Sequence, residues 1–466
     1  PGYVDKVLKA SGVPGMSVAV VYQGKVLLAE GYGVRDVTTG VPVDADTVFQ
    51  LASVSKSVGA TVIAREVASG TVAWDTPLVK NLPDFLLADP WVTQHVTIAD
   101  MYTHRSGLYS HAGDELEDLG YDQAEIFERL RYTPLGDFRA EENYTNFGLT
   151  AAAESVARAA GTDWATLSER DLYAPLGMTS TSSRFADFMA RGNRATSHVP
   201  IDGQWKVTTL QRHPDAQSPA GGVSSSASDM ASWMKLVLGN GTVDGREVIP
   251  ADALTPAITA QFVSKPSSSA AARSGLSGYG FNVGVTPGGL PMLSHSGAFA
   301  LGTGTSYTML PGQGLGIVVL TNGSPVGAAE AVAAQFIDLA QFGEPRQDWW
   351  TLAHAMLAPL MDPLGELAGK TPPASPAPAQ PLSTYVGDYA NTYFGTARVS
   401  VEGDQLRLKV GPDATGWLLT HWDGDVFTYK PYNENATPGT VGKATFSSGR
   451  LTLELMDAHG LGTFTR

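Results

Sequence analysis

The stretch from Thr47 to Lys56, TVFQLASVSK, constrains the fold of this chain most, because a β-branched and aromatic run turns there directly into a helix. Ser53 stands at the junction and Lys56 follows three residues later, so a helix would place both side chains on one face. A lysine within reach can take the proton of a serine hydroxyl if burial lowers its pKa. Unpaired N–H groups at the start of the helix can stabilise an oxyanion. Ser53 and Lys56 are therefore a candidate nucleophile and base.

The pattern Ser-x-x-Lys is a weak signal by itself, and the chain contains a second copy at Ser232 and Lys235. That copy lies within residues 229–238, where apolar residues recur at helical spacing, so Ser232 is expected in the middle of an amphipathic helix. We interpret the second copy as structural, because only the first copy stands at a turn from strand to helix.

The composition is that of a globular protein with a large core. The chain has 466 residues, enough for two or three domains, of which 43% are hydrophobic and 17% charged. A formal charge of −15 argues against nucleic acid and anionic membranes as partners. No apolar run reaches the length of about 18 residues that a membrane span needs. Without cysteines or closely spaced histidine ligands, the chain is predicted to hold no metal and no cofactor.

Strand patterns near both ends of the first 345 residues indicate one antiparallel sheet with a helical insertion. The apolar runs 17–22 and 25–29 are joined at Gln23-Gly24 and form a hairpin pattern. The pattern between residues 74 and 239 is mostly helical, and the acidic stretch 114–122 within it is expected to be a solvated loop. Later strands are expected at 290–294, 305–309 and 316–322, and a closing helix at 328–342.

A proline-rich stretch, residues 371–381, separates this part from a C-terminal part in which the hydrophobic period is two. Closely spaced hairpins there predict a small antiparallel barrel. Their strands are expected at 399–401, 406–410, 444–446 and 451–455. The predicted domains are a hydrolase domain at 1–345, a helix and linker at 346–381 and a barrel at 382–466.

Two further motifs complete a candidate site. Tyr144-Thr-Asn146 lies in the helical part, and His295-Ser-Gly297 is expected to end the strand that begins at Leu290. Both motifs recur without this order and setting, at Tyr389-Ala-Asn391 and His111-Ala-Gly113.

The succession Ser-x-x-Lys, Tyr-x-Asn and His-x-Gly resembles the penicillin-recognising serine hydrolases, above all the branch of class C β-lactamases, D-aminopeptidases, D,D-peptidases and related esterases. Phrases typical of that family also occur at 103–108, 220–225 and 320–322. The resemblance implies a two-lobed α/β fold of the β-lactamase type, an antiparallel sheet flanked by helices. The C-terminal barrel resembles the lipocalin-like appendage of some peptidases of this family.

The resemblance implies catalytic roles that agree with the chemistry of the residue types. Ser53 would attack the carbonyl carbon, while Lys56 and Tyr144 would share the work of the base. Tyr144 would also protonate the leaving group. Asn146 would bind the substrate amide. Either Lys56 or Tyr144 can be the first proton acceptor.

The third motif is expected to bind the substrate through His295 and Gly297. The N–H groups of Ser53 and Ala298 are expected to form the oxyanion hole. Histidine is mostly neutral near pH 7 and is a weaker anchor for a substrate carboxylate than the lysine found there in other members of the family. His295 therefore lowers the expectation of β-lactamase and D,D-carboxypeptidase activity.

The predicted function is a serine peptidase or amidase that acts through an acyl-enzyme on small peptides with D-residues or unusual linkages. The alternatives are a carboxylesterase with the same chemistry and a penicillin-binding receptor with slow turnover. The expected partners are a small peptide or ester substrate, and a homo-oligomer of the chain is compatible with the sequence. The resemblance favours export from a bacterial cell to the periplasm or the medium, with a cytoplasmic location as the alternative.

Overall fold

The computed structural model describes residues 1–412 and 415–466, and these form two compact units. The first unit comprises residues 1–84, 91–107 and 137–361, and the second comprises 85–90, 108–136 and 362–466. The helical segment 108–136 thus belongs to the same unit as the C-terminal barrel, although it interrupts the first unit in the sequence. The domain boundaries at residues 345 and 381 remain a prediction, namely that residues 1–345 and 382–466 fold independently.

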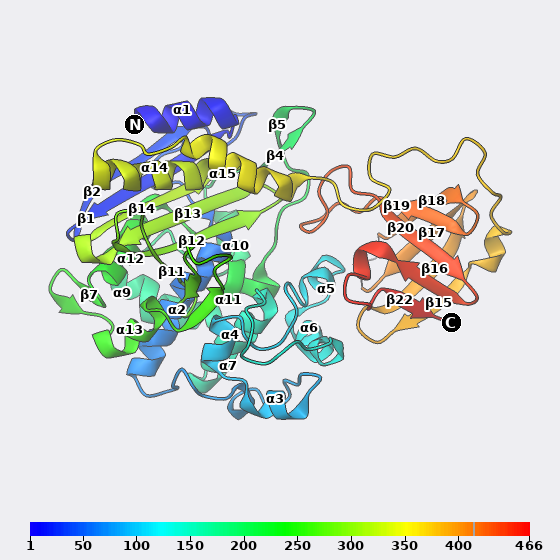
Figure 1. The fold of residues 1–466 in the computed structure, drawn as a ribbon, viewed down its shortest axis with the longest axis horizontal. Helices are drawn as coiled ribbons and strands as arrows, with labels where there is room; N and C mark the ends of the chain where they lie inside the picture. Colours follow the sequence, from blue (N-terminus) through cyan, green and yellow to red (C-terminus); the bar gives the residue numbers. More distant parts are fainter. Residues whose placement is uncertain (413–414) are drawn as a thin grey trace. The chain divides into compact units, whose positions relative to one another are not determined.

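The first unit is built on an eight-stranded antiparallel sheet with the order β2-β1-β14-β13-β12-β11-β10-β9 (Figure 1). Strand β1 pairs with its hairpin partner β2 and with β14, so both ends of this unit meet in one sheet. The predicted hairpin and the three predicted later strands are confirmed. The strands are β1 (Gly15–Tyr22), β2 (Lys25–Gly33), β9 (Phe262–Lys265), β10 (Gly275–Ser277), β11 (Asn282–Val285), β12 (Pro291–Phe299), β13 (Thr303–Leu310) and β14 (Leu315–Thr321).

Strand β12 corrects one prediction, because the His-x-Gly motif does not end it. Gly297 pairs with Thr305, Ala298 pairs with Gly304, and the strand continues to Phe299. Hydrogen bonds to β13 extend the strand as far as Phe299, beyond the apolar run 290–294 that predicted it.

Helices cover both faces of the sheet (Figure 1). On one face, Val18 of β1 and Val319 of β14 pack in a hydrophobic cluster with residues of α1 and α14. On the other face, Trp233 of α12 is fully buried and its ring lies 5.1 Å from that of Tyr307 in β13. The helices that frame the sheet are α1 (Gly2–Ser11), α2 (Ser55–Ala68), α12 (Ala227–Leu238), α14 (Ala328–Phe342) and α15 (Trp349–Leu357).

Between β2 and β9 the first unit is mostly helical, as predicted. Helix α7 (Asn146–Ala159) packs against α2, α4 (Ile98–Tyr102) and α11 (Ser218–Gly221), and α11 also packs against α2. These helices bring together the Ser-x-x-Lys motif at the start of α2 and the Tyr-x-Asn motif at the start of α7, whereas the His-x-Gly motif lies in β12. Within the described part of the chain, no helix has the length and apolar character needed to cross a membrane.

The second unit contains a closed barrel of eight antiparallel strands, in which both predicted hairpins are confirmed. Alternate side chains such as Val399, Leu408, Phe427 and Phe446 are buried inside it. Closure removes the exposed strand edges that a small open sheet would leave. The strands are β15 (Gly387–Asn391), β16 (Gly395–Glu402), β17 (Gln405–Val410), β18 (Trp417–Asp423), β19 (Val426–Tyr429), β20 (Gly442–Ser447), β21 (Arg450–Leu453) and β22 (Thr463–Thr465).

The acidic stretch 114–122 is not the solvated loop that the charges predicted. Its first part forms helix α5 (Asp114–Asp118), and Leu116 and Leu119 are buried. The barrel residue Tyr393 accepts a hydrogen bond from the backbone N–H of Gly113, over 2.9 Å. Burial of the two leucines in the second unit outweighs the preference of the acidic side chains for water.

Candidate active site

Ser53 lies in a short 3-10 helix (Ala52–Val54) that directly precedes α2. Ala52 has a φ angle of 47°, a left-handed conformation that residues with a side chain rarely adopt. The Oγ1 atom of Thr305 in β13 donates a hydrogen bond to the carbonyl oxygen of Leu51 over 2.7 Å. The sheet thus holds the sharp turn that presents Ser53, and neither the turn angle nor the role of Thr305 was apparent in the sequence.

Lys56 is completely buried and is held by acceptors from three elements. Its Nζ atom lies 3.2 Å from Oγ of Ser53, 2.7 Å from Oδ1 of Asn146 and 2.9 Å from the carbonyl oxygen of Ala220. Hydrogen bonds of this kind compensate an ammonium group for the loss of water. The sequence predicted the meeting of Ser53, Lys56 and Asn146, but a backbone carbonyl such as that of Ala220 has no sequence signature.

Tyr144 lies against Lys56 and against a histidine that the motifs did not single out. The Nζ atom of Lys56 is 4.6 Å from the centre of the Tyr144 ring, and the ring of His104 is 4.5 Å from it. The backbone N–H of Thr145 donates to Nδ1 of His104 over 3.2 Å, so Nδ1 is an acceptor. His104 therefore fixes both the ring and the backbone beside Tyr144. The only sequence signal for it was its place in the phrase at 103–108.

Gly297 brings strand β12 directly against the turn that carries Ser53. A Cβ atom at Gly297 would lie 2.2 Å from the carbonyl oxygen of Leu51 and 3.0 Å from the backbone nitrogen of Ser53. Only glycine permits this approach without a shift of the backbone. Ala298 is the next residue of the strand, so the two N–H groups predicted for the oxyanion hole belong to segments in close contact.

His295 is neutral over the physiological pH range. Burial and the nearby charge of Lys56 lower the pKa of His295 to about 4. Its Nδ1 atom lies 2.7 Å from the carbonyl oxygen of Ser296, which can only accept, so Nδ1 carries the hydrogen. The neutral ring then has its lone pair on Nε2, and His295 is an acceptor rather than a cation.

A small cavity of about 30 Å³ adjoins Tyr144 and His295. It has room for about one water molecule. His104, Glu142 and Phe281 also line it, and burial raises the pKa of Glu142 above its usual value. The cavity lies within the first unit, next to the side chains expected to handle protons.

The second copies of the motifs have structural partners. Nζ of Lys235 binds the carboxylate of Asp244 over 2.9 Å, and Ser232 lies inside α12 as predicted. Asn391 donates to the carbonyl oxygens of Leu461 and Thr463, and His111 contacts Asp114 over 2.9 Å.

Comparison with known protein families gives two matches. The profile of the family described as Beta-lactamase matches residues 2–342. A second profile, described as a domain of unknown function (DUF3471), matches residues 371–454, which include most of the barrel.

Three similar proteins have names that describe different activities. The unguisins hydrolase ungD of Aspergillus violaceofuscus is 26% identical, over 95% of this chain and 83% of its own. Penicillin-binding protein 4 of Amycolatopsis lactamdurans is 28% identical, over 82% of this chain and 93% of its own. Esterase EstB of Burkholderia gladioli is 32% identical over 37% of this chain and 48% of its own.

Two solved structures share the fold. The octameric penicillin-binding protein homologue from Pyrococcus abyssi aligns with a TM-score of 0.64 at 18% identity and covers all of this chain and 98% of its own. A class C beta lactamase from Rhodobacter sphaeroides aligns with a TM-score of 0.60 at 23% identity, over 73% of this chain and 97% of its own.

Proposed function

The chain belongs to the beta-lactamase family and is a serine hydrolase, and we propose that it cleaves amide bonds of small peptides through an acyl-enzyme on Ser53. The observation that carries this proposal is the 3.2 Å distance between Nζ of Lys56 and Oγ of Ser53 at a turn held by the sheet. A hydroxyl needs a base within hydrogen-bonding reach to become a nucleophile, and this distance meets that condition.

In acylation, Oγ of Ser53 attacks the carbonyl carbon and its proton passes to Lys56 or to Tyr144. The carbonyl oxygen becomes an oxyanion that the N–H groups of Ser53 and Ala298 stabilise. The carbon–nitrogen bond then breaks, and the departing amine takes the proton from Tyr144. Asn146 orients both Lys56 and the substrate amide.

In deacylation, a water molecule attacks the ester carbon and transfers a proton to Lys56 or Tyr144. The cavity of about 30 Å³ beside Tyr144 and His295 is a suitable place for that water. The bond between the acyl carbon and Oγ of Ser53 breaks, Ser53 recovers its proton, and the product acid leaves.

A peptide substrate without a carboxylate next to the scissile bond suits His295. A neutral imidazole with an acceptor at Nε2 favours an N–H or O–H group of the substrate over an anion. One relative is named as a hydrolase of unguisins, and it covers nearly the whole chain. We therefore place amidase or peptidase activity on neutral peptides first.

Carboxylesterase activity is the second candidate, because the relative with the highest of the three identities is named an esterase. A matched pair of substrates separates the two, namely a neutral D-alanyl peptide amide and the ester with the same acyl group. Peptidase function predicts a higher kcat/KM for the amide after correction for the intrinsic reactivity of the ester. A negligible rate on every amide, together with fast ester cleavage, would establish the esterase.

Active-site labelling tests the nucleophile independently of the substrate. A serine-directed phosphonate should add to Ser53, and Ser53→Ala should lose both labelling and hydrolysis while keeping the thermal stability of the parent protein. Labelling at Ser232 would overturn the assignment. A stable acyl adduct with penicillin and no hydrolysis of any substrate would instead support the penicillin-binding receptor.

We also propose that the chain forms homo-oligomers, since the structural relative that covers its whole length is described as octameric. Light scattering coupled to size-exclusion chromatography measures the mass of the particle. A mass of 49.0 kDa, that of a single chain, at all protein concentrations would contradict self-association.

A further inference from the structure

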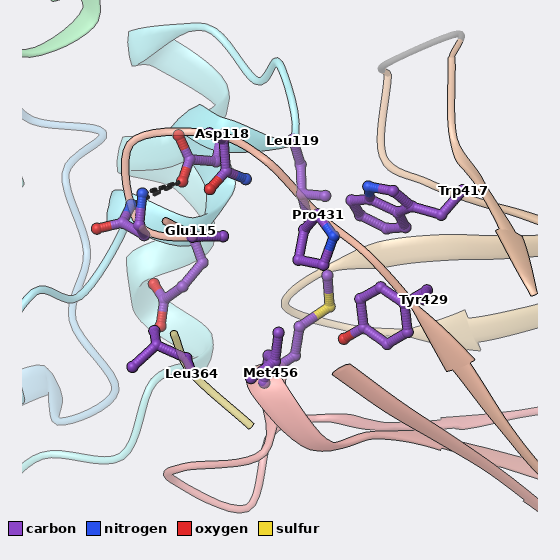
Figure 2. A pocket seen from close by; sticks show the side chains of 12 residues that line it. Glu115, Asp118, Leu119, Leu364, Trp417, Tyr429, Pro431 and Met456 are labelled. Atoms are coloured by element: carbon purple, nitrogen blue, oxygen red, sulfur yellow. Dashed lines mark hydrogen bonds between the residues drawn. The ribbon is translucent and has the colours of Figure 1, made fainter. Parts of the chain in front are cut away.

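A pocket of about 100 Å³ lies inside the second unit, between segment 108–136 and the barrel. Figure 2 shows Glu115 with Leu364 beside its carboxylate on one side of the view and the rings of Trp417 and Tyr429 on the other. The two rings lie 5.2 Å apart and are tilted by 39°. The remaining apolar lining includes Leu119, Pro431, Leu455 and Met456. The pocket is thus mostly apolar, with the carboxylates of Glu115 and Asp118 in its lining.

Three polar atoms of the lining have no hydrogen-bond partner among the residues that the structure describes. These are Oε2 of Glu115, Oδ1 of Asn433 and the hydroxyl of Tyr429, and all three are shut off from solvent although the Glu115 side chain is partly exposed elsewhere. Asp118, in contrast, accepts hydrogen bonds from the backbone and the side chain of Asn435, over 3.2 and 2.7 Å. Buried acceptors without donors are costly, so the pocket is incomplete as it stands.

The charges around Glu115 favour a cation as the missing partner. Burial raises the pKa of Glu115 to about 7, and the negative charges of Asp114 and Asp118 add to that rise while His111 opposes it. Neither lysine nor arginine is among the described residues that line the pocket. No set of three or more histidine, aspartate or glutamate side chains in residues 1–412 and 415–466 is placed to hold a metal ion.

We propose that this pocket binds a primary alkylammonium group, with its nitrogen donating to Oε2 of Glu115 and Oδ1 of Asn433. The alkyl chain lies against the apolar lining, and the rings of Trp417 and Tyr429 contribute their electron-rich faces. A volume of about 100 Å³ is smaller than the roughly 150 Å³ that holds benzene, so the group has about four carbons. A free amine and a lysine side chain both have this chemistry.

The test is a binding titration of the full chain by saturation-transfer NMR with n-butylammonium chloride at pH 8, where the raised pKa leaves Glu115 ionised. The matched neutral ligand is n-butanol, which has nearly the same size and shape. We expect saturable binding of n-butylammonium and at least tenfold weaker binding of n-butanol. A parallel titration with N-acetyl-lysine N-methylamide distinguishes a free amine from a lysine side chain as the natural ligand. Only a pocket that accepts a lysine side chain should bind this compound as tightly as n-butylammonium.

Glu115→Gln is the diagnostic variant, since it keeps the shape and removes the charge. It should weaken n-butylammonium binding at least tenfold and leave n-butanol binding unchanged. Glu128→Gln is the control, because Glu128 lies in α6 (Gln123–Arg129) of the same unit, is exposed and does not line the pocket. Equal binding of the two ligands, no saturable binding of n-butylammonium, or equal affinity in both variants would overturn the proposal. The ligand comparison in the parent protein decides even if Glu115→Gln does not fold.

Discussion

The Nζ atom of Lys56 lies 2.7 Å from Oδ1 of Asn146, a residue 90 positions further along the chain. Because the carbonyl of Ala220 holds the same nitrogen from another helix, the amine has little freedom except toward Oγ of Ser53. The distance from amine to hydroxyl is therefore set by α2, α7 and α11 together and not by α2 alone. A lysine on the same face of an isolated helix would move freely, as long side chains do.

This arrangement predicts that Lys56→Ala and Tyr144→Phe each lower kcat by about 10²- to 10⁴-fold, since each removes a group that handles protons. The double variant should lose less than the product of the two single losses, because the two side chains act as a unit. Steady-state kinetics on the preferred substrate measure all three values.

Lys235→Ala is the matched control for Lys56→Ala, because Lys235 occupies the same place in the second Ser-x-x-Lys and forms an ion pair with the exposed Asp244. It should leave kcat unchanged. If the Lys56 variant kept its kcat as well, Lys56 would not be a base.

The sequence was most informative where a function needs particular side chains. Ser53, Lys56 and Asn146 were predicted to share a site, and they do share hydrogen bonds. The sheet joining β1 to β14 was predicted as well, because strands with buried faces have a clear hydrophobic pattern. The catalytic and binding roles of Ser53, Lys56 and Asn146 remain predictions.

Features that depend on backbone geometry or on distant packing could not be predicted. The left-handed turn at Ala52 has no glycine to mark it, and the carbonyl of Ala220 has no side-chain signal. The charge pattern of the stretch 114–122 was misleading, because Leu116 and Leu119 are buried in a unit whose barrel lies far along the chain. The contact between Gly113 and Tyr393 joins residues 280 positions apart. Patterns in a local window carry no information about such partners.

Gly297→Ala tests the close contact between β12 and the Ser53 turn. Its Cβ would lie 2.2 Å from the Leu51 carbonyl oxygen, so the strand or the turn must shift. We expect a loss of about 1–3 kcal/mol in the free energy of unfolding. Displacement of the Ser53 N–H should also lower kcat by about 10²-fold or more. Chemical denaturation and kinetics measure the two effects.

Gly312→Ala is the control for that change, since a Cβ at Gly312 would meet no atom within 4 Å. It should alter neither stability nor kcat appreciably. A Gly297→Ala variant that was destabilised but had an unchanged kcat would show that the contact is structural only.

Tyr393→Phe tests how firmly segment 108–136 is held in the second unit. The Tyr393 hydroxyl accepts from the N–H of Gly113 over 2.9 Å and lies 3.1 Å from the hydroxyl of Tyr109, all in buried surroundings. Its removal leaves two buried donors without an acceptor and should cost about 1–3 kcal/mol. Hydrogen exchange should therefore become faster in residues 108–136.

The control for this prediction is Tyr132→Phe, because Tyr132 belongs to the same segment and is 44% exposed. Its exchange pattern should match that of the parent protein. Faster exchange throughout the barrel, rather than in segment 108–136, would mean that Tyr393 supports the barrel itself and not the docked segment.

The pH dependence of His295 follows from its lowered pKa. Its pKa is about 6.5 in the unfolded chain and about 4 in the folded protein. Between these values the unfolded chain binds more protons, so the contribution of His295 to stability is complete above pH 6.5 and is lost as the pH falls toward 4. In His295→Gln, which does not titrate, this part of the pH dependence of unfolding should disappear.

His295→Lys tests the role of the same position in specificity. A permanent cation in place of a neutral acceptor should raise the ratio of kcat/KM for a carboxylate-bearing peptide to that for its amide, despite repulsion from Lys56. In the parent protein the ratio should stay flat from pH 8 to pH 5, because His295 acquires its proton only near pH 4. His295→Gln is the neutral control and should keep the ratio of the parent. If His295→Lys lowered kcat/KM equally for both substrates, His295 would orient the catalytic side chains without contacting the substrate.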